Sequence, residues 1–192
     1  VLDFGNIIRG SFKKRVFSVV NTGFGAASLS FDKRGLGSAG FTIEPDRIAR
    51  IPGHPQNEAF PVEVSLQTKG LEEGQFERVV QMQIRNSPPA QLLLRANVIV
   101  PEVTLSSQRL LFNNVVVGQC KKMYVQLCNP KRLPCEWSFK PNRDLSNVDQ
   151  KFFVAEPSEG VLDPDEKVNL EITFSPNEAR DFSAKLYIRC QQ

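Results

Sequence analysis

The 192-residue sequence has no uninterrupted apolar run of the length, about 18 residues, that a membrane-spanning helix requires. Its longest apolar stretches, such as 92–94 and 98–100, have the length of strands. The first residues also lack the charged start and the long apolar core of a signal peptide, so we expect them to come from within a longer protein. The sequence therefore predicts neither a membrane anchor nor a membrane partner.

Groups for catalysis and metal binding are equally scarce. His54 is the only histidine, and it lies in a Pro-Gly-His-Pro segment typical of a turn. A catalytic triad or a zinc site would need partner residues that the sequence does not offer, so we interpret His54 as a loop residue. Gly35-Leu36-Gly37 lacks the Gly-Lys-Ser/Thr of a phosphate loop, and we predict a hairpin loop there. We predict no enzyme, cofactor, metal or small-molecule substrate.

The positive charge is too small and too dispersed for a nucleic-acid-binding surface. The net charge is +3. Residues 1–100 contain 12 basic and 9 acidic side chains, and residues 101–192 contain 12 of each. Nucleic-acid-binding proteins gather their basic residues on one face, so we predict no nucleic-acid partner.

Cysteine is absent from the first half, and no Asn-x-Ser/Thr glycosylation site occurs anywhere. Both observations favour a reducing, cytoplasmic compartment. The four cysteines are Cys120, Cys128, Cys135 and Cys190. Cys120 and Cys128 share one face of a predicted strand, whereas Cys190 is in phase with core positions of another. A disulfide between Cys190 and either of them is not expected, and free thiols are predicted.

The sequence does contain an internal repeat. Gly10, Lys13-Lys14 and Asn21 recur as Gly118, Lys121-Lys122 and Asn129, each 108 residues later. Similar segments follow in the same order, at offsets that change only where loops are expected. The pairs are Ala27/Leu29/Phe31 with Cys135/Trp137/Phe139, Phe41 with Phe153, 62–66 with 170–174, and 84–85 with 188–189. We predict two tandem modules, residues 1–100 and 101–192.

Each repeat alternates apolar and polar residues between clusters of Gly, Pro and Asn, which indicates short strands and tight turns. The fold class predicted is all-β, with two tandem immunoglobulin-like antiparallel sandwiches. Strands are expected near 1–5, 12–20, 26–31, 40–44, 60–67, 76–85 and 91–99, then near 108–112, 119–128, 134–139, 152–156, 168–174 and 181–190. The second module is expected to lack its last strand. That strand either follows Gln192 or is donated by a partner.

Two features have both a structural and a functional interpretation. Trp137 is in phase with its apolar neighbours, which favours a core position over a ligand-stacking one. The repeated lysines Lys13, Lys14, Lys121 and Lys122 are either solvated strand starts or a basic patch for an acidic partner such as a tubulin tail. They are the candidate partner-binding residues.

The order of the motifs resembles the MSP/PapD-like superfamily and, within it, the ASH modules of ciliary and centrosomal proteins. The resemblance rests on segments spread over nearly the whole chain: Phe4-Gly5, 19–23, 41–45, Phe112, 153–157, 162–164 and 172–176. Two positions depart from the pattern. Asn113 replaces the glycine after the phenylalanine, and Asn129-Pro130 replaces Asn-Thr-Gly.

The resemblance implies a non-catalytic structural module of a larger protein. Such a module would contact axonemal or microtubule-associated proteins and neighbouring modules of its own chain. It would belong to the cytoskeleton of the motile cilium, in the central apparatus of the axoneme, and would support ciliary movement. An extracellular adhesion or receptor fragment is the alternative, because such proteins share the sandwich architecture.

Overall fold

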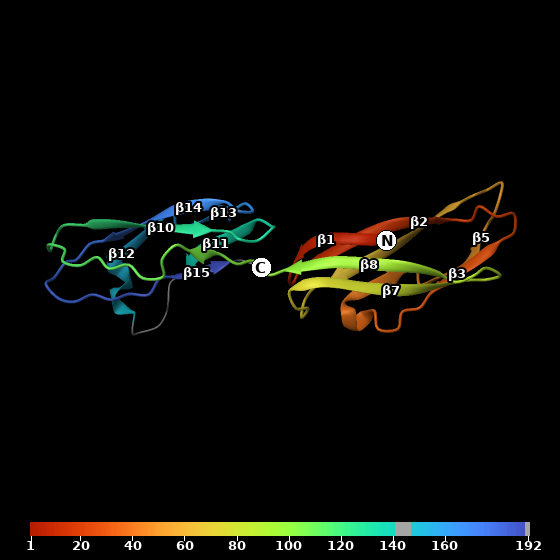
Figure 1. The fold of residues 1–192 in the computed structure, drawn as a ribbon, viewed down its shortest axis with the longest axis horizontal. Coiled ribbons are helices and arrows are strands. Elements are labelled where there is room, and N and C mark those ends of the chain that lie inside the picture. Colours follow the sequence, from red (N-terminus) through yellow and green to blue (C-terminus); the bar gives the residue numbers. More distant parts are fainter. Residues whose placement is uncertain (141–146, 191–192) are drawn as a thin grey trace. The chain divides into compact units, whose positions relative to one another are not determined.

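The computed structural model describes residues 1–140 and 147–190, and nearly all of its regular structure is strand (Figure 1). The all-β prediction is therefore confirmed. The chain divides into two compact units, Val1–Val100 and Pro101–Gln192.

The first unit contains two sheets. The larger has the order β1-β8-β7-β3-β5, in which β1 runs parallel to β8 and the other neighbours are antiparallel. The smaller has the order β2-β6-β4 and is antiparallel throughout. The bounds are β1 Leu2–Ile8, β2 Phe12–Val20, β3 Ala27–Phe31, β4 Phe41–Glu44, β5 Arg47–Ile51, β6 Ala59–Gln67, β7 Gly74–Ile84 and β8 Ala90–Ile99, with a short 3₁₀ helix η1 at Gly37–Ala39.

The second unit also contains two sheets, both antiparallel, with the orders β12-β14-β10-β9 and β13-β11-β15. The bounds are β9 Thr104–Leu105, β10 Lys121–Cys128, β11 Cys135–Lys140, β12 Phe153–Glu156, β13 Glu159–Leu162, β14 Lys167–Phe174 and β15 Tyr187–Cys190, with a 3₁₀ helix η2 at Val148–Phe152.

Strand alternation builds one hydrophobic core in each unit. In β6, Val62, Val64 and Leu66 are fully buried and belong to the core of the first unit. In the second unit, Trp137 is 2% exposed and packs in the core, as its phase predicts. Removing such side chains from water supplies the main favourable term in folding.

The repeat is visible in the contacts of the two cores as well as in the sequence. Phe4 and Phe41 meet edge to face in the first unit, with ring centroids 5.7 Å apart. Phe112 and Phe153, at the corresponding positions, meet in the same way at 5.6 Å. The two units therefore place equivalent aromatic pairs in the same edge-to-face contact. Aromatic side chains prefer this arrangement.

The structure corrects three predicted segments and adds three strands that were not predicted. No strand forms at 108–112, and the last predicted strand begins at Tyr187 rather than at 181. Strands β5, β9 and β13 were missed. The predicted hairpin loop at 35–37 leads into η1, and its Leu36 is buried in the core.

The physical reasons are local. In the first unit β1 is held by β8, and the described residues of the second unit contain no equivalent of β8 beside 108–112. In β5, Ile48 and Ile51 both point inward although they are three residues apart. A bulge between Ala27 and Leu29 in the β3–β5 pairing accommodates the extra residue and hides the period of two.

Candidate functional site

The first lysine of each repeated pair holds the backbone nine residues before it. The Lys13 ammonium donates to the Phe4 carbonyl at 2.6 Å. The Lys121 ammonium donates to the Phe112 carbonyl at 2.7 Å. Both carbonyls belong to phenylalanines of the equivalent edge-to-face contacts in the two units. This lysine therefore ties the segment that precedes the first long strand of its unit to that strand.

The second lysine of each pair bridges two neighbouring strands. Lys14 forms an ion pair with Glu63 at 2.6 Å, and Lys122 forms one with Glu171 at 2.6 Å. The lysine side chains remain about half exposed, and such surface pairs contribute little stability. The Lys122 ammonium and then the Tyr124 hydroxyl lower the pKa of the Glu171 carboxyl. All four candidate lysines thus have partners within their own unit, and binding to another protein stays a prediction for them.

Two asparagines each form several side-chain hydrogen bonds. The sequence had indicated these asparagines only as equivalent positions of the repeat. The Asn129 side chain is fully buried, and its amide donates to the carbonyls of Leu133, Leu162 and Asp163. The Asn21 amide donates to the carbonyls of Gly25 and Ile51. Each asparagine therefore closes the loop four residues long that follows it and ties it to the neighbouring strand.

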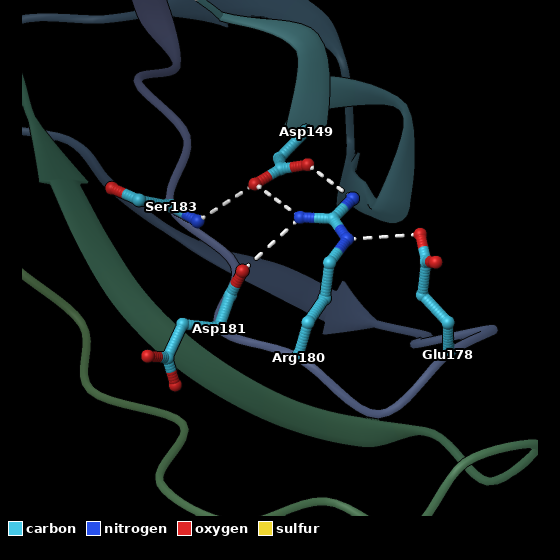
Figure 2. A network of polar contacts seen from close by, with 5 residues as sticks. All are labelled: Asp149, Glu178, Arg180, Asp181 and Ser183. Carbon is cyan, nitrogen blue, oxygen red and sulfur yellow. Dashed lines mark hydrogen bonds and ion pairs between the residues drawn. The ribbon is translucent and has the colours of Figure 1, made fainter.

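A polar network around Arg180 lies in the second unit and includes none of the predicted site residues (Figure 2). The Arg180 guanidinium donates to both oxygens of Asp149, at 2.8 and 3.2 Å, and to Glu178 at 2.9 Å. Its Cζ atom lies 4.0 Å from the Phe182 ring centroid. The Ser183 amide also donates to Asp149. This network joins η2 to the segment before β15.

Acidification is expected to weaken this network. The Arg180 guanidinium and the Ser183 amide hold the pKa of Asp149 below its ordinary value of 3.8. The unfolded chain then binds a proton more readily than the folded one, so the stabilisation is complete above about pH 4 and is lost as the pH falls further. Trp137 is the only tryptophan, so its fluorescence reports on the second unit. Thermal unfolding should show that Asp149→Asn lowers the Tm at pH 7 but makes it less sensitive to acid than in wild type. Equal acid sensitivity would contradict the assignment.

The cysteines differ sharply in exposure, and all four have free thiols. Cys120 is exposed, whereas Cys135 is 1% exposed in the core. Burial, and then the neighbouring Cys190 thiol, raise the pKa of Cys135 to about 12. Cys190 lies opposite Trp137 in the β11–β15 pairing, which puts both thiols on the inner face of the sheet.

Alkylation should follow this order, because the thiolate is the reactive form. We expect iodoacetamide at pH 8 to modify Cys120 first and Cys135 last in the folded chain, as read by peptide mass spectrometry. Under denaturing, non-reducing conditions all four thiols should react. Two reactive thiols or none would instead support the extracellular alternative.

His54 lies at a loop tip beside Phe24, and their ring centroids are 5.6 Å apart. Phe24 is 88% exposed. The two loops approach closely because position 53 is glycine: a Cβ there would lie 2.1 Å from the Gly23 carbonyl oxygen. The same carbonyl accepts from the His54 amide at 2.8 Å. The ring contact is the feature of His54 that the sequence did not indicate.

Over residues 1–140 and 147–190, no three His, Cys, Asp or Glu side chains gather as a metal site would require. No helix in that part of the chain is long and apolar enough to cross a bilayer. The described surface carries exposed loop tips such as that of Phe24 and half-exposed charged side chains such as Lys14 and Lys122.

Comparison with known proteins connects this architecture to a family. Residues 105–186 match the family model of the inositol polyphosphate 5-phosphatase OCRL-like ASH domain. Over all of its residues, the chain is 30% identical to the hydrocephalus-inducing protein homolog of Homo sapiens and 29% identical to the hydrocephalus-inducing protein of Mus musculus. The chain resembles hydrocephalus-inducing protein over all of its residues and an ASH domain over residues 105–186. It spans about 4% of the length of the curated relatives that it matches.

Solved structures with a related arrangement are more distant in sequence. They include a Porphyromonas gingivalis W83 protein of unknown function, with 12% identity and a TM-score of 0.41, covering 88% of this chain and 77% of that one. The CupB2 chaperone of Pseudomonas aeruginosa has 13% identity and a TM-score of 0.35, covering 99% of this chain and 96% of that one.

Proposed function

We propose that this chain is a non-catalytic protein-contact segment of a larger ciliary protein, located in the central apparatus of the motile-cilium axoneme and supporting ciliary movement. The observation that carries the proposal is the similarity to hydrocephalus-inducing protein along the whole chain. The resemblance of its motifs to ASH modules of ciliary and centrosomal proteins supports the same location. Because the chain spans a small part of those relatives, its partners are inferred from its own surface.

The partners proposed are axonemal or microtubule-associated proteins and neighbouring modules of the same chain. Residues 1–100 and 101–192 would act as two immunoglobulin-like modules. The structure supplies rigid sheets with exposed edges, and protein partners commonly bind such edges by adding a strand.

The test is co-sedimentation of the purified chain with demembranated motile axonemes. We expect saturable binding. Reversing the charge of Lys13, Lys14, Lys121 and Lys122 by substitution with Glu should weaken binding roughly tenfold at low salt if an acidic partner contacts them, since each surface pair contributes modestly. The control Lys69→Glu with Lys140→Glu, one exposed lysine in each unit, matches in charge the double variant Lys14→Glu with Lys122→Glu.

Two results would count against these assignments. Absence of saturable axoneme binding by the wild-type chain would contradict the proposed function. Unchanged binding by the four-lysine variant would remove the lysines from the contact surface and leave the function standing. Because Lys13 and Lys121 also hold backbone carbonyls, the double variant Lys14→Glu with Lys122→Glu separates lost binding from lost structure.

A further inference from the structure

Strands β5, β3 and β7 carry a row of polar side chains across the outer face of the larger sheet of the first unit (Figure 1). Ser30 of β3 lies opposite Arg47 of β5 and opposite Gln83 of β7. The Arg85 amide donates to the Ser28 carbonyl at 3.1 Å, which places Arg85 beside Ser28 in the same sheet. The apolar residues that alternate with them in these strands belong to the core or pack against it, so the row faces outward.

These side chains surround an open hollow of about 360 Å³ that has no acidic residue in its lining. Its polar lining residues are Ser28, Ser30, Arg47, Gln83 and Arg85. Neither arginine forms an ion pair within residues 1–140 and 147–190. Guanidinium groups bind carboxylates with paired hydrogen bonds, and the serine hydroxyls and the glutamine amide are further donors. The hollow therefore fits a carboxylate ligand.

A bulge in β5 adds a third arginine to this face. It places two residues of β5 opposite Ser28, and one of them is Arg50. Arg50 is exposed, whereas Ile48 and Ile51 on either side of the bulge are buried. The acidic side chains at the border of the face are already paired, Asp32 with Arg34 and Asp46 with Lys33. The positive charge of Arg47, Arg50 and Arg85 is thus left unbalanced within the described residues.

The second unit shows that the fold does not require a basic face here. Ser138, which corresponds to Ser30, lies between Glu159 of β13 and Arg189 of β15. Glu136 stands where the first unit has Ser28, 108 residues later. The corresponding face of the second unit therefore carries charges of both signs, and the arginine cluster is a property of the first unit alone.

The chain that leads into a unit leaves this face accessible. Residues 101–120 precede β10 of the second unit, and the strand that they contribute, β9, joins the other sheet. Glu136 and Glu159, on the face that corresponds to the arginine cluster, are exposed with those residues present. A segment in front of a unit therefore does not need to cover this sheet.

We propose that the basic face of the first unit, formed by Arg47, Arg50 and Arg85 around Ser28 and Ser30, binds an acidic segment of a partner protein. Neighbouring strands lie about 5 Å apart, so β5 and β7 hold their arginines about 10 Å from each other. An extended chain places successive side chains of one side about 7 Å apart, so a continuous run of acidic residues reaches both strands. The proposal rests on the proposed function, since it names the partner class that this protein-contact segment takes.

The probe is the synthetic peptide Gly-Glu-Glu-Glu-Glu-Glu-Glu-Gly, with blocked ends and a fluorescent label. Fluorescence anisotropy with the chain of residues 1–192 should show saturable binding that weakens as salt is added. Arg47→Ala with Arg85→Ala should weaken binding roughly tenfold, because two charge-assisted contacts are lost. The same peptide with lysine in place of every glutamate should not compete.

Charge reversal separates this face from the net charge of the chain. Arg47→Glu with Arg85→Glu should shift the preference from the glutamate peptide towards the lysine peptide. The matched control is Arg109→Glu with Arg132→Glu, two exposed arginines of the second unit, which changes the net charge by the same amount and should bind as wild type does. All these side chains are exposed, so far-UV circular dichroism and the Tm should show that each variant is folded.

Several outcomes would overturn the proposal. They are no binding of the glutamate peptide to the wild-type chain, equal binding by the folded Arg47→Ala, Arg85→Ala variant, and an equal loss in the matched control. Displacement of the peptide by millimolar inorganic phosphate would assign the hollow to a phosphate group instead. A concentration-dependent dimer that charge reversal at Arg47 and Arg85 abolishes would assign the face to a second copy of the chain. Axoneme binding retained by the folded charge-reversed variant would reject this face while leaving the proposed function intact.

Discussion

Trp137→Ala is expected to lower the free energy of unfolding of the second unit by about 3–5 kcal/mol, the usual cost of removing a large aromatic side chain from a core. Trp137 is 2% exposed and meets Phe139 edge to face, with ring centroids 6.0 Å apart. Gly160 packs against the indole so closely that a Cβ there would lie 3.3 Å from the indole nitrogen.

The measurement is urea unfolding followed by far-UV circular dichroism, with the two units resolved as separate transitions. The transition of the first unit should stay where it is, and that of the second should move to lower urea. Trp137→Phe keeps an aromatic ring and should lose less than the alanine variant. A loss below about 1 kcal/mol in Trp137→Ala would show that the indole is not a core residue, since surface substitutions fall in that range.

Asn129→Ala should cost the second unit about 1–3 kcal/mol, because it leaves buried carbonyl groups without a donor. The Asn129 amide serves the carbonyls of Leu133, Leu162 and Asp163 from a fully buried position. Its counterpart Asn21 is only partly buried, so water can replace its hydrogen bonds more readily. The loss in Asn21→Ala should therefore be smaller.

Trp137 fluorescence during urea unfolding measures the Asn129 effect in the second unit, and circular dichroism measures the Asn21 effect in the first. Asn129→Asp serves as the control for shape, since it keeps the size but replaces the amide donors with acceptors. It should be at least as destabilising as alanine. Equal stability of Asn129→Ala and wild type would contradict the closing role assigned to this side chain.

Much of the fold could be predicted because half-buried strands alternate apolar and polar residues. That pattern is clear in β2, β6, β10 and β14, and the structure has strands there. It fails at β5, where a bulge makes both buried isoleucines face inward at a spacing of three. It also fails at 108–112, since an apolar segment becomes a strand only when another strand is present to pair with it.

The contacts of the candidate site were harder to predict from the sequence than the strands were. The repeated lysines were visible, and so were Glu63 and Glu171, which also stand 108 residues apart and could have been recognised as their ion-pair partners. Asp149 and Arg180 gave no comparable signal. They lie 31 residues apart, Asp149 in the short helix η2 and Arg180 in the segment before β15, and their contact arises from tertiary packing alone.

Proximity labelling from this chain inside intact motile cilia tests the central claim most directly. A labelling enzyme is fused to residues 1–192, and the destabilised Trp137→Ala variant serves as the control for unfolded protein. The account predicts that the labelled neighbours are axonemal proteins, with those of the central apparatus enriched over the control. Labelling dominated by secreted matrix proteins, or no enrichment of axonemal proteins over the control, would contradict it.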